Sequence, residues 1–361
     1  MSDMQLRLSL IRESGFRLQL DTRIPGRGIS AIYGPSGCGK TTLLYCLAGL
    51  LRADAGSEIY VGDQQWQGAE QFLPAHQRRV GFVFQDARLF PHLDVAANLA
   101  YALKRRRSDK GPTLAQVCDW LQLEPLLSQA GNALSRGQQQ RVAIGRALLS
   151  APDILLMDEP LANIDAASRV QIIGHLERLQ RESQVPVVYV SHDMEEVARL
   201  ADWLLVMDAG QIVAEGDTLE LCSHLELAIA HEEQAAACVS ATVTRQDREF
   251  GLTELNLEGQ SLTVAAVEAT AGSIMRLRIP ARDISLCLQR PEQTSIQNIL
   301  EVRIIEIEEG ESSKLLLRLQ LGDQYLLARL TRKSIAELKL APGQQVYAQI
   351  KSVALLSHVQ P

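Results

Sequence analysis

The sequence predicts an α/β domain built on a mostly parallel sheet, followed by an all-β domain of barrel type. Short apolar runs rich in β-branched residues alternate with helical stretches up to about residue 235, which is typical of a parallel sheet. Beyond that point, short strand-like runs follow one another at close spacing, separated by turn residues. The length of 361 residues also favours two or three domains.

The elements of the first domain follow from local patterns. Residues 1–20 alternate between apolar and polar side chains, as a half-buried antiparallel pair does. The β-branched strand GISAIYG leads into a glycine loop and a helical stretch. Further helical stretches, at 133–150, 166–183 and 193–202, lie between four apolar strands: RVGFVFQ, DILLMDE, VPVVYVSH and WLLVMDAGQIV. A mostly helical subdomain at about 92–150 interrupts this alternation.

The second domain is expected to begin near 231–237, where the alternation of strands and helices gives way to closely spaced strand-like runs. We therefore expect one domain at 1–235 and another at 236–361. Within the second domain, LQLGDQYLLARL predicts a hairpin, because a Gly-Asp turn separates two strand-like runs.

The composition argues against several classes of protein. Residues 1–235 hold 22 basic and 29 acidic residues and the remainder 14 of each, so neither part is a basic nucleic-acid-binding body. Aromatic residues make up only 4%, too few for a stacking platform. The six cysteines include no Cys-x-x-Cys pair, which favours free thiols in a reducing compartment. No apolar run reaches the roughly eighteen residues of a membrane span.

The most specific motif is G-x-x-x-x-G-K-[ST], which lies between a predicted strand and a predicted helix. Its glycines let the backbone curl so that N–H groups face phosphates, its lysine reaches the terminal phosphates, and its threonine hydroxyl can ligate Mg²⁺. The sequence therefore predicts a nucleotide-binding loop made of Gly34, Pro35, Ser36, Gly37, Cys38, Gly39, Lys40, Thr41 and Thr42.

Buried strands end in polar residues that suit the same chemistry. Asp158 ends ILLMD, where it can hold Mg²⁺ opposite Thr41, and Glu159 follows, where it can polarise the attacking water. Gln85 follows VGFVF, and its neutral amide can bind Mg²⁺ or that water. His192 follows VVYVS, where an imidazole can contact the terminal phosphate. We expect Glu159, His192 and Gln85 to be catalytic, and Thr41, Gln85 and Asp158 to hold the metal.

A second helix start also suits an anion. In ALSRGQQQRVAIGRALL, Ser135 and Gln138 form a capping-box pattern before an apolar helix. The backbone N–H groups of Arg136 and Gly137 lie between them, free to meet a phosphate.

Taken in order, these motifs resemble the ATP-binding subunits of ABC transporters, which are α/β P-loop NTPases with a helical insert. The resemblance covers about residues 1–235, and the matching segments are the loop 34–41, Gln85, LSRGQ at 134–138, ILLMDE at 154–159, LANID at 161–165 and His192. It implies that ATP and Mg²⁺ bind and that two copies of the chain pack head to tail. Ser135, Gly137 and Gln138 of one copy would then read the nucleotide of the other.

The resemblance also implies further nucleotide contacts and raises one question. It places Asp165 at the nucleotide site and makes Phe16, by position, the adenine-stacking aromatic. The signature usually reads Leu-Ser-Gly-Gly-Gln, and here Arg136 replaces the first glycine. If that position needs a positive φ, arginine costs about 1 kcal/mol, and otherwise the change is harmless. The loop 162–165 is a mild variant of the family's Ser-Ala-Leu-Asp, and we expect an active ATPase.

Two further segments indicate the cargo. VGFVFQDARLFPHLDVAANLAYAL is similar to the ATP-binding subunits of bacterial molybdate importers, and PEQTSIQNIL with QQVYAQIKSVAL is similar to the small OB-like barrel of Mop/TOBE-type domains. This implies molybdate import through a transmembrane permease fed indirectly by a periplasmic oxyanion-binding protein, with no nucleic-acid partner. The expected location is the cytoplasmic face of the bacterial inner membrane, as a peripheral protein.

The barrel resemblance implies that the second domain binds molybdate or tungstate and thereby regulates the importer. Backbone N–H groups and small polar side chains can hold such a dianion without a basic surface. Serine and asparagine also commonly cap local backbone, so a plain turn is the alternative. The candidate residues are Thr294, Ser295, Asn298, Lys351 and Ser352.

Other interpretations remain open at this point. One is an importer ATPase for another cargo such as sulfate, with a merely structural barrel. Another is a soluble ABC-type ATPase acting on DNA or ribosomes, and a third is an oxyanion sensor with a vestigial ATPase. The basic run KRRR at 104–107 is either a solvated charge run or a contact with the permease or lipid headgroups.

Overall fold

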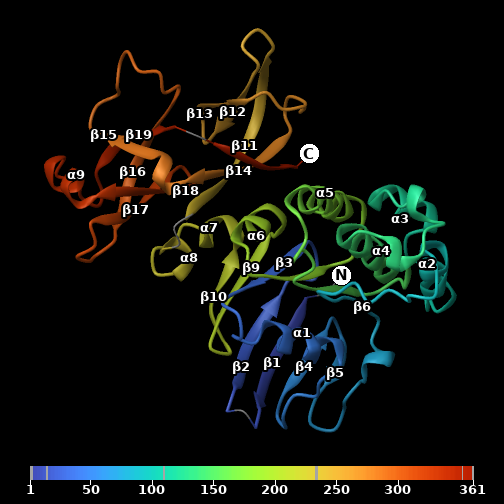
Figure 1. Cartoon of the computed structure of the whole chain (residues 1–361). Helices are drawn as coiled ribbons and strands as arrows, with labels where there is room; N and C mark the ends of the chain where they lie inside the picture. The colour runs from blue at the N-terminus through green and yellow to red at the C-terminus, as the bar shows by residue number, and fades with distance from the viewer. Residues whose placement is uncertain (1–2, 14, 109, 232–234, 352, 360–361) are drawn as a thin grey trace. The chain divides into compact units, whose positions relative to one another are not determined.

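The computed structural model of the chain (Figure 1) forms two compact units, Met1–Glu215 and Gly216–Pro361, which are described one after the other. The residues that it describes are 3–13, 15–108, 110–231, 235–351 and 353–359.

A six-stranded sheet in the order β10-β9-β3-β8-β7-β6 forms the centre of the first unit. β3 pairs in parallel with β8 and β9, and β7 pairs in parallel with β6 and β8. Every side chain of β7 and β8 is buried, which explains their uninterrupted apolar sequences. The predicted parallel sheet is confirmed, and its strands are β3 (Ile29–Tyr33), β6 (Val80–Val83), β7 (Ile154–Asp158), β8 (Val187–Ser191), β9 (Trp203–Asp208) and β10 (Gln211–Asp217).

Three helices follow strands of this sheet: α1 (Lys40–Ala48) follows β3, α5 (Ala166–Glu182) follows β7, and α6 (Met194–Leu200) follows β8. Each connection therefore leaves the carboxyl end of a parallel strand. The loops before the three helices meet at one edge of the sheet, where ligands bind in open α/β folds.

A four-stranded antiparallel sheet, in the order β2-β1-β4-β5, completes the core of the first unit. The alternating side chains of β1 are buried together with those of α1 and of the central strands in one hydrophobic cluster. The predicted antiparallel pair near the N-terminus is present, with Met4 paired to Ile24. The strands are β1 (Met4–Ile11), β2 (Arg17–Ile24), β4 (Glu58–Val61) and β5 (Gln64–Gln67), and the short helix η1 (Ala75–Gln77) follows.

A helical subdomain lies between β6 and β7, as predicted for about 92–150. Side chains cap its helices: Asp94 accepts from the N–H of Ala97, and Thr113 forms a capping box with Gln116. Among the described residues, no helix is both long and apolar enough to cross a membrane. The helices are α2 (Val95–Lys104), α3 (Leu114–Leu121), η2 (Glu124–Leu126), η3 (Gly131–Ala133) and α4 (Arg136–Leu149).

The second unit contains two five-stranded sheets, in the orders β13-β12-β11-β14-β20 and β15-β19-β16-β17-β18. The predicted hairpin is present, since β17 and β18 pair antiparallel with Leu321 opposite Gln324. The strands are β11 (Ala236–Asp247), β12 (Leu252–Leu257), β13 (Gln260–Ala265), β14 (Ile274–Pro280), β15 (Ile284–Cys287), β16 (Asn298–Ile307), β17 (Lys314–Leu321), β18 (Gln324–Thr331), β19 (Gln345–Ile350) and β20 (Ala354–Val359). The short helices are α7 (Thr218–Leu221), α8 (Ala228–His231), η4 (Ala281–Asp283) and α9 (Arg332–Glu337).

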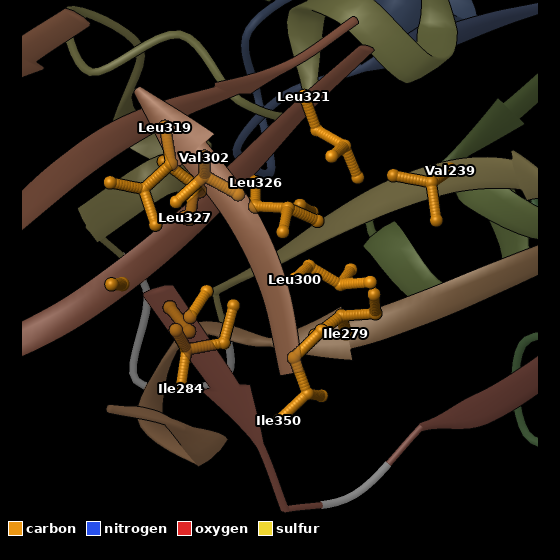
Figure 2. Close-up of a cluster of buried hydrophobic side chains, with 14 of the residues drawn as sticks. Val239, Ile279, Ile284, Leu300, Val302, Leu319, Leu321, Leu326, Leu327 and Ile350 are labelled. Carbon is orange, nitrogen blue, oxygen red and sulfur yellow. The ribbon is translucent and has the colours of Figure 1, made fainter. Parts of the chain in front are cut away.

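One hydrophobic core joins the two sheets of the second unit. Figure 2 shows Val239 and Ile279 of the first sheet beside Leu300, Leu326 and other side chains of the second. Three side-chain amides add a polar link between the sheets, because each pairs with both the N–H and the C=O of one residue opposite. These amide clamps join Gln260 to Glu301, Asn298 to Thr263, and Gln324 to Ser240.

The division between the units differs from the domain boundary expected near 231–237. It falls at Glu215 and Gly216, because α7 packs against β11 and β18. Leu225 and Ala230, which follow α7, are buried in the core of the second unit. The change in sequence pattern near 231–237 marks the start of the first strand of the second unit, whereas the apolar side chains of the short helices before it are already buried with the β-sheets.

Candidate functional site

Residues 34–41 form a loop between β3 and α1 at the carboxyl edge of the central sheet. Gly37 and Gly39 have φ angles of 84° and 111°, in the left-handed region that favours glycine. Gly39 is the N-cap of α1 and leaves the first N–H groups of the helix without a side-chain cap. The side chain of Lys40 is buried and donates to the carbonyl oxygens of Gly34 and Pro35 at 2.8 and 3.0 Å. An uncapped helix start beside a lysine is a site for phosphate.

A cavity of about 340 Å³ adjoins this loop. It brings together Phe16, Glu159 and most of the predicted loop residues: Ser36, Gly37, Gly39, Lys40, Thr41 and Thr42. Phe16 lies in the turn between β1 and β2, and a methyl group added to Gly39 would come within 2.8 Å of Phe16 Cζ. The aromatic ring thus abuts the loop, as its predicted role at the nucleotide requires.

Arg12 also lines this cavity, although no motif in the sequence indicates it. Its backbone N–H donates to the carbonyl oxygen of Phe16 at 2.9 Å, which closes the turn between β1 and β2. Because that turn decides where Arg12 lies, no motif in the linear sequence could have placed it here.

Asp158 and Thr41 come together at the end of β7. Thr41 Oγ1 donates to Asp158 Oδ1 over 2.9 Å. Burial raises the pKa of the Asp158 carboxyl, while the hydrogen bond from Thr41 and the charge of Lys40 oppose that shift. A hydroxyl and a carboxylate at this separation form an oxygen donor set that suits Mg²⁺.

Glu159 follows Asp158 with an unusual backbone. Its φ is 44°, a left-handed value that costs a non-glycine residue about 1 kcal/mol or more. Its N–H donates to the carbonyl oxygen of Val190 at 3.1 Å, which holds this conformation at the sheet edge. Glu159 Oε1 then lies 3.9 Å from Lys40 Nζ, and Oε2 lies 3.2 Å from Nδ1 of His192. The His192 side chain is 57% exposed, so the pair faces solvent.

The structure places Gln85 in a different hollow. This hollow, of about 370 Å³, is lined by Gln85 together with Arg136 and Gln139 of the helical subdomain, Asn163 of the loop 161–165, and further residues. Gln140 in α4 donates to the carbonyl oxygen of Phe84 at 3.0 Å, which attaches the end of β6 to that subdomain. Gln85 is therefore set beside the signature segment rather than in the cavity at residues 34–41.

The signature segment has the predicted capping box. Ser135 is the N-cap of α4, its hydroxyl accepts from the N–H of Gln138, and the Gln138 amide accepts from the N–H of Ser135. Gly137 is buried, and a methyl group there would lie 2.8 Å from Cβ of Ser168 in α5. Among the described residues lining the cavity at 34–41, residues 135–138 do not appear. The chain thus presents two separate candidate phosphate-binding helix starts.

Arg136 fits its position without backbone strain. It is the first residue of α4 and has no positive φ, so the cost considered for this substitution does not arise. Its Nη1 donates to the carbonyl oxygen of Asn163, 3.5 Å away, in the loop 161–165. Asp165 ends that loop as the N-cap of α5 and accepts from the N–H of Ser168 at 2.9 Å. That hydrogen bond lowers the pKa of Asp165.

The candidate oxyanion residues of the second unit are held by local structure. Both polar groups of the Asn298 amide pair with the backbone of Thr263, at 2.7 and 2.9 Å. Thr294 is exposed and accepts from the N–H of Ile296 through its hydroxyl, and Ser295 is exposed beside it. The Lys351 N–H donates to the carbonyl oxygen of Asp283. Ser352 lies outside the described residues.

Comparison with known proteins finds matches to both units. Residues 19–162 match the ABC transporter family, and residues 294–356 match the TOBE domain. The chain is 45% identical to the molybdenum import ATP-binding protein ModC of Aromatoleum aromaticum, over 95% of this chain and 91% of the relative. It is 44% identical to ModC of Hahella chejuensis, over 94% and 96% of the two chains.

Solved structures agree on the fold of the first unit. The dimeric post-hydrolysis ATP-binding cassette MJ0796, bound to ADP and phosphate, matches with a TM-score of 0.50 and 26% identity over 60% of this chain and 98% of that chain. CbiO1 of Clostridium perfringens, part of the ABC transporter complex CbiONQ, matches with a TM-score of 0.52 and 24% identity over 60% and 88%.

The fold and the residues at the sheet edge define an ABC-type P-loop ATP-binding subunit followed by an all-β, OB-like TOBE-type domain. The match to the curated relatives runs over almost the whole length of both chains. The chain belongs to the family of molybdenum import ATP-binding proteins.

Proposed function

We propose that the chain is the ATP-hydrolysing subunit of a molybdate importer. It hydrolyses ATP to ADP and phosphate and thereby drives import through a transmembrane permease. The observation that carries this proposal is the convergence of Lys40, Thr41, Asp158, Glu159 and His192 at one edge of the sheet. The cargo is inferred from the curated relatives. These are molybdenum import proteins, and they match this chain over nearly their whole length.

Each residue at the edge has a distinct role in this proposal. The loop 34–41 and Lys40 bind the phosphates, and Phe16 stacks on the adenine. Thr41 and Asp158 hold Mg²⁺, with Gln85 as a further ligand that must approach from its own hollow. Bound Mg²⁺ neutralises phosphate charge.

Glu159 accepts a proton from the attacking water, since its carboxylate lines the cavity between Lys40 and His192, and His192 contacts the terminal phosphate. The position of Glu159 between Lys40 and His192 supports this assignment. Lys40 Nζ lies 3.9 Å from one oxygen of the carboxylate and the imidazole lies 3.2 Å from the other, so the two neighbours orient Glu159 at the cavity.

A second copy of the chain completes the site. Ser135, Gly137, Gln138 and Asp165 lie outside the cavity of their own loop, so they are assigned to the nucleotide of the partner. The dimeric structure of the similar cassette MJ0796 supports such an assembly. The further partners are the permease, which places the subunit at the cytoplasmic face of the bacterial inner membrane, and indirectly a periplasmic oxyanion-binding protein.

Uptake in cells tests the cargo. In a strain that lacks its own molybdate ATPase, this chain should restore molybdate uptake with the cognate permease, and Lys40→Ala should not. Sulfate uptake is measured in parallel, because the ATPase of a sulfate importer would not restore molybdate uptake. Purified chain with Mg²⁺ and ATP should release phosphate, and absence of release in both the isolated and the permease-bound subunit would contradict the ATPase assignment.

Oxyanion binding by the second unit is a separate proposal. Thr294, Ser295 and Lys351 are the exposed candidates, whereas the Asn298 amide is already paired with Thr263. Calorimetric titration of the full chain with molybdate, tungstate and sulfate tests it. Binding of the first two ions that Ser295→Ala abolishes would support a sensor, and no binding would leave the unit with a structural role.

A further inference from the structure

A buried polar cluster lies behind His192 and has no role in the assignments above. Its centre is Glu196 in α6, which is 6% exposed. Glu196 Oε2 accepts hydrogen bonds from the hydroxyls of Tyr189 and Ser191, both at 2.8 Å. These two residues belong to β8, the strand that ends directly before His192. A carboxylate is costly to bury unless it is paired, so its presence needs compensation.

Arg169 supplies the opposite charge. It lies in the first turn of α5, with Nε 3.6 Å from Glu196 Oε1. Its Nη1 donates to Asp193 Oδ2 at 3.0 Å. The other oxygen of Asp193 accepts from the N–H groups of Glu195 and Glu196 and so caps α6. One guanidinium therefore connects the cap of α6 to the buried carboxylate, as a planar fork with several donors can.

His192 lies between two residues that this cluster holds. Ser191 donates its hydroxyl proton to Glu196, and the same oxygen accepts from the N–H of Asp193 at 3.0 Å. Asp193 is held by Arg169. The backbone on both sides of His192 is thus fixed, while the imidazole itself is exposed and faces Glu159.

The same arginine is attached to the loop 161–165. The N–H of Arg169 donates to the carbonyl oxygen of Asp165, one helical turn away, at 2.9 Å. Asp165 caps α5 through Ser168. The loop 161–165 therefore leads directly into the helical turn that carries Arg169.

We propose that Arg169 and Glu196 are positioning residues that hold His192 beside Glu159 and couple its place to the loop 161–165. This inference rests on the proposed ATPase function. Closure of a second copy onto the loop would be transmitted to His192 through these two side chains, so that assembly of the pair and the position of the histidine are linked.

Kinetics of the full chain with Mg²⁺ and ATP tests the positioning role. Arg169→Gln and Glu196→Gln should lower kcat about tenfold or more, because small displacements of reacting groups cost that much, while KM for ATP changes little. Arg169→Lys keeps the charge without the fork and should recover part of the loss. The matched control is Glu177→Gln, which breaks an ion pair with Arg199 between the same two helices at 2.7 Å and should leave kcat unchanged.

The same substitutions in a His192→Ala variant distinguish a positioning role from a general loss of structure. In His192→Ala, adding Arg169→Gln should lower the residual rate no further, because the residue through which it acts is gone. An equal fold-loss with and without His192, or a loss in Glu177→Gln as large as in Arg169→Gln, would overturn the inference. Thermal melts of each variant identify any that fails to fold, and Arg169→Lys, on a half-exposed arginine, then serves in its place.

The crystal structure of Glu196→Gln gives a readout that needs no turnover. We expect the distance between His192 Nδ1 and Glu159 Oε2 to exceed the 3.2 Å of the unaltered chain. An unchanged position of His192 would overturn the inference even if the rate fell. Lack of ATP hydrolysis by the unaltered chain and permease would instead overturn the proposed function and leave this geometric result standing.

Discussion

His192 Nδ1 lies 3.2 Å from Glu159 Oε2, although the two residues follow different strands of the central sheet. The other oxygen of Glu159 lies 3.9 Å from Lys40 Nζ. One carboxylate therefore faces a buried cation on one side and an exposed imidazole on the other. This arrangement makes Glu159 the residue whose loss should separate nucleotide binding from hydrolysis.

Glu159→Gln should lower the rate of ATP hydrolysis by about 10²- to 10⁴-fold, because the amide cannot accept a proton from water. Binding of ATP should persist, since the loop 34–41 and Lys40 are untouched. Phosphate release and ATP affinity are measured side by side, with Lys40→Ala as the variant that loses both. Equal loss of binding in Glu159→Gln would contradict the assignment.

Gly39→Ala should weaken nucleotide binding by roughly tenfold or more, since an alanine strains a φ of 111° and its methyl group meets Phe16 Cζ at 2.8 Å. Gly56→Ala is the control, because Gly56 has a φ of 87° and open space around it. The control should lose about 1 kcal/mol of stability and keep its nucleotide affinity. ATP affinity and thermal melts of both variants check this, and equal affinities would show that the contact with Phe16 is unimportant.

Arg136→Gly, which restores the usual signature glycine, should not raise the ATPase rate. The arginine has no positive φ, so no strain is relieved. The variant loses the contact with the carbonyl of Asn163 and should be less stable by about 0.5–1 kcal/mol, because glycine lowers helix stability. A thermal melt and the ATPase rate of the variant test this prediction. A variant that hydrolyses ATP several-fold faster would show that Arg136 does impose strain.

Arg78→Met should destabilise the first unit by about 3 kcal/mol. Arg78 is buried, and its guanidinium donates to the carbonyls of Cys46 and Leu47 at the end of α1, to that of Leu73 and to that of Trp66. Burial lowers the pKa of Arg78 to about 10, so the group remains charged and complements the negative end of the helix.

Denaturant unfolding measures the loss in Arg78→Met. Arg7→Met is the control, because the ion pairs of Arg7 with Asp21 and Glu58 are exposed, so the substitution should cost about 1 kcal/mol or less. Similar losses in the two variants would mean that the carbonyl contacts of Arg78 contribute little.

Acid should destabilise the first unit in part through His175. Burial, and secondly the charge of Arg141, lower the pKa of this histidine below its usual 6.5. Between the lowered pKa and pH 6.5 the unfolded chain binds more protons than the folded chain. The contribution of His175 to the free energy of unfolding is therefore complete above pH 6.5 and is lost as the pH falls through that window. Melting temperatures from about pH 8 to pH 5 measure the loss. His175→Gln should flatten the dependence, and an unchanged slope would exclude this histidine as its source.

The sequence predicts this site well wherever the chemistry lies in one short segment. The glycines, Lys40 and Thr41 are neighbours in the chain, and Asp158 and Glu159 end one apolar strand, so local patterns locate them. Gln85 is predicted equally well as a strand end, but the direction in which it faces depends on α4, which the pattern does not contain.

Contacts between distant segments of the chain cannot be predicted from such local patterns. Arg12 reaches the cavity through a turn, and Arg169 meets Glu196 only because α5 and α6 pack side by side. Asn298 lies in a stretch that resembles an oxyanion motif, yet its amide is paired with Thr263 on another strand. Whether a polar side chain is free for a ligand depends on such long-range partners, which the linear sequence does not reveal.

The amide clamps of the second unit determine where the chain can be cut. Asn298 and Gln324 lie within the segment 294–356 that matches the TOBE domain, but their partners Thr263 and Ser240 lie outside it. A fragment limited to that match would lose those partners and the strands β11 to β14 of the first sheet. A recombinant fragment of the second unit should therefore begin at Gly216. Limited proteolysis should release residues 216–361 as one resistant fragment, and its two sheets should unfold in a single thermal transition.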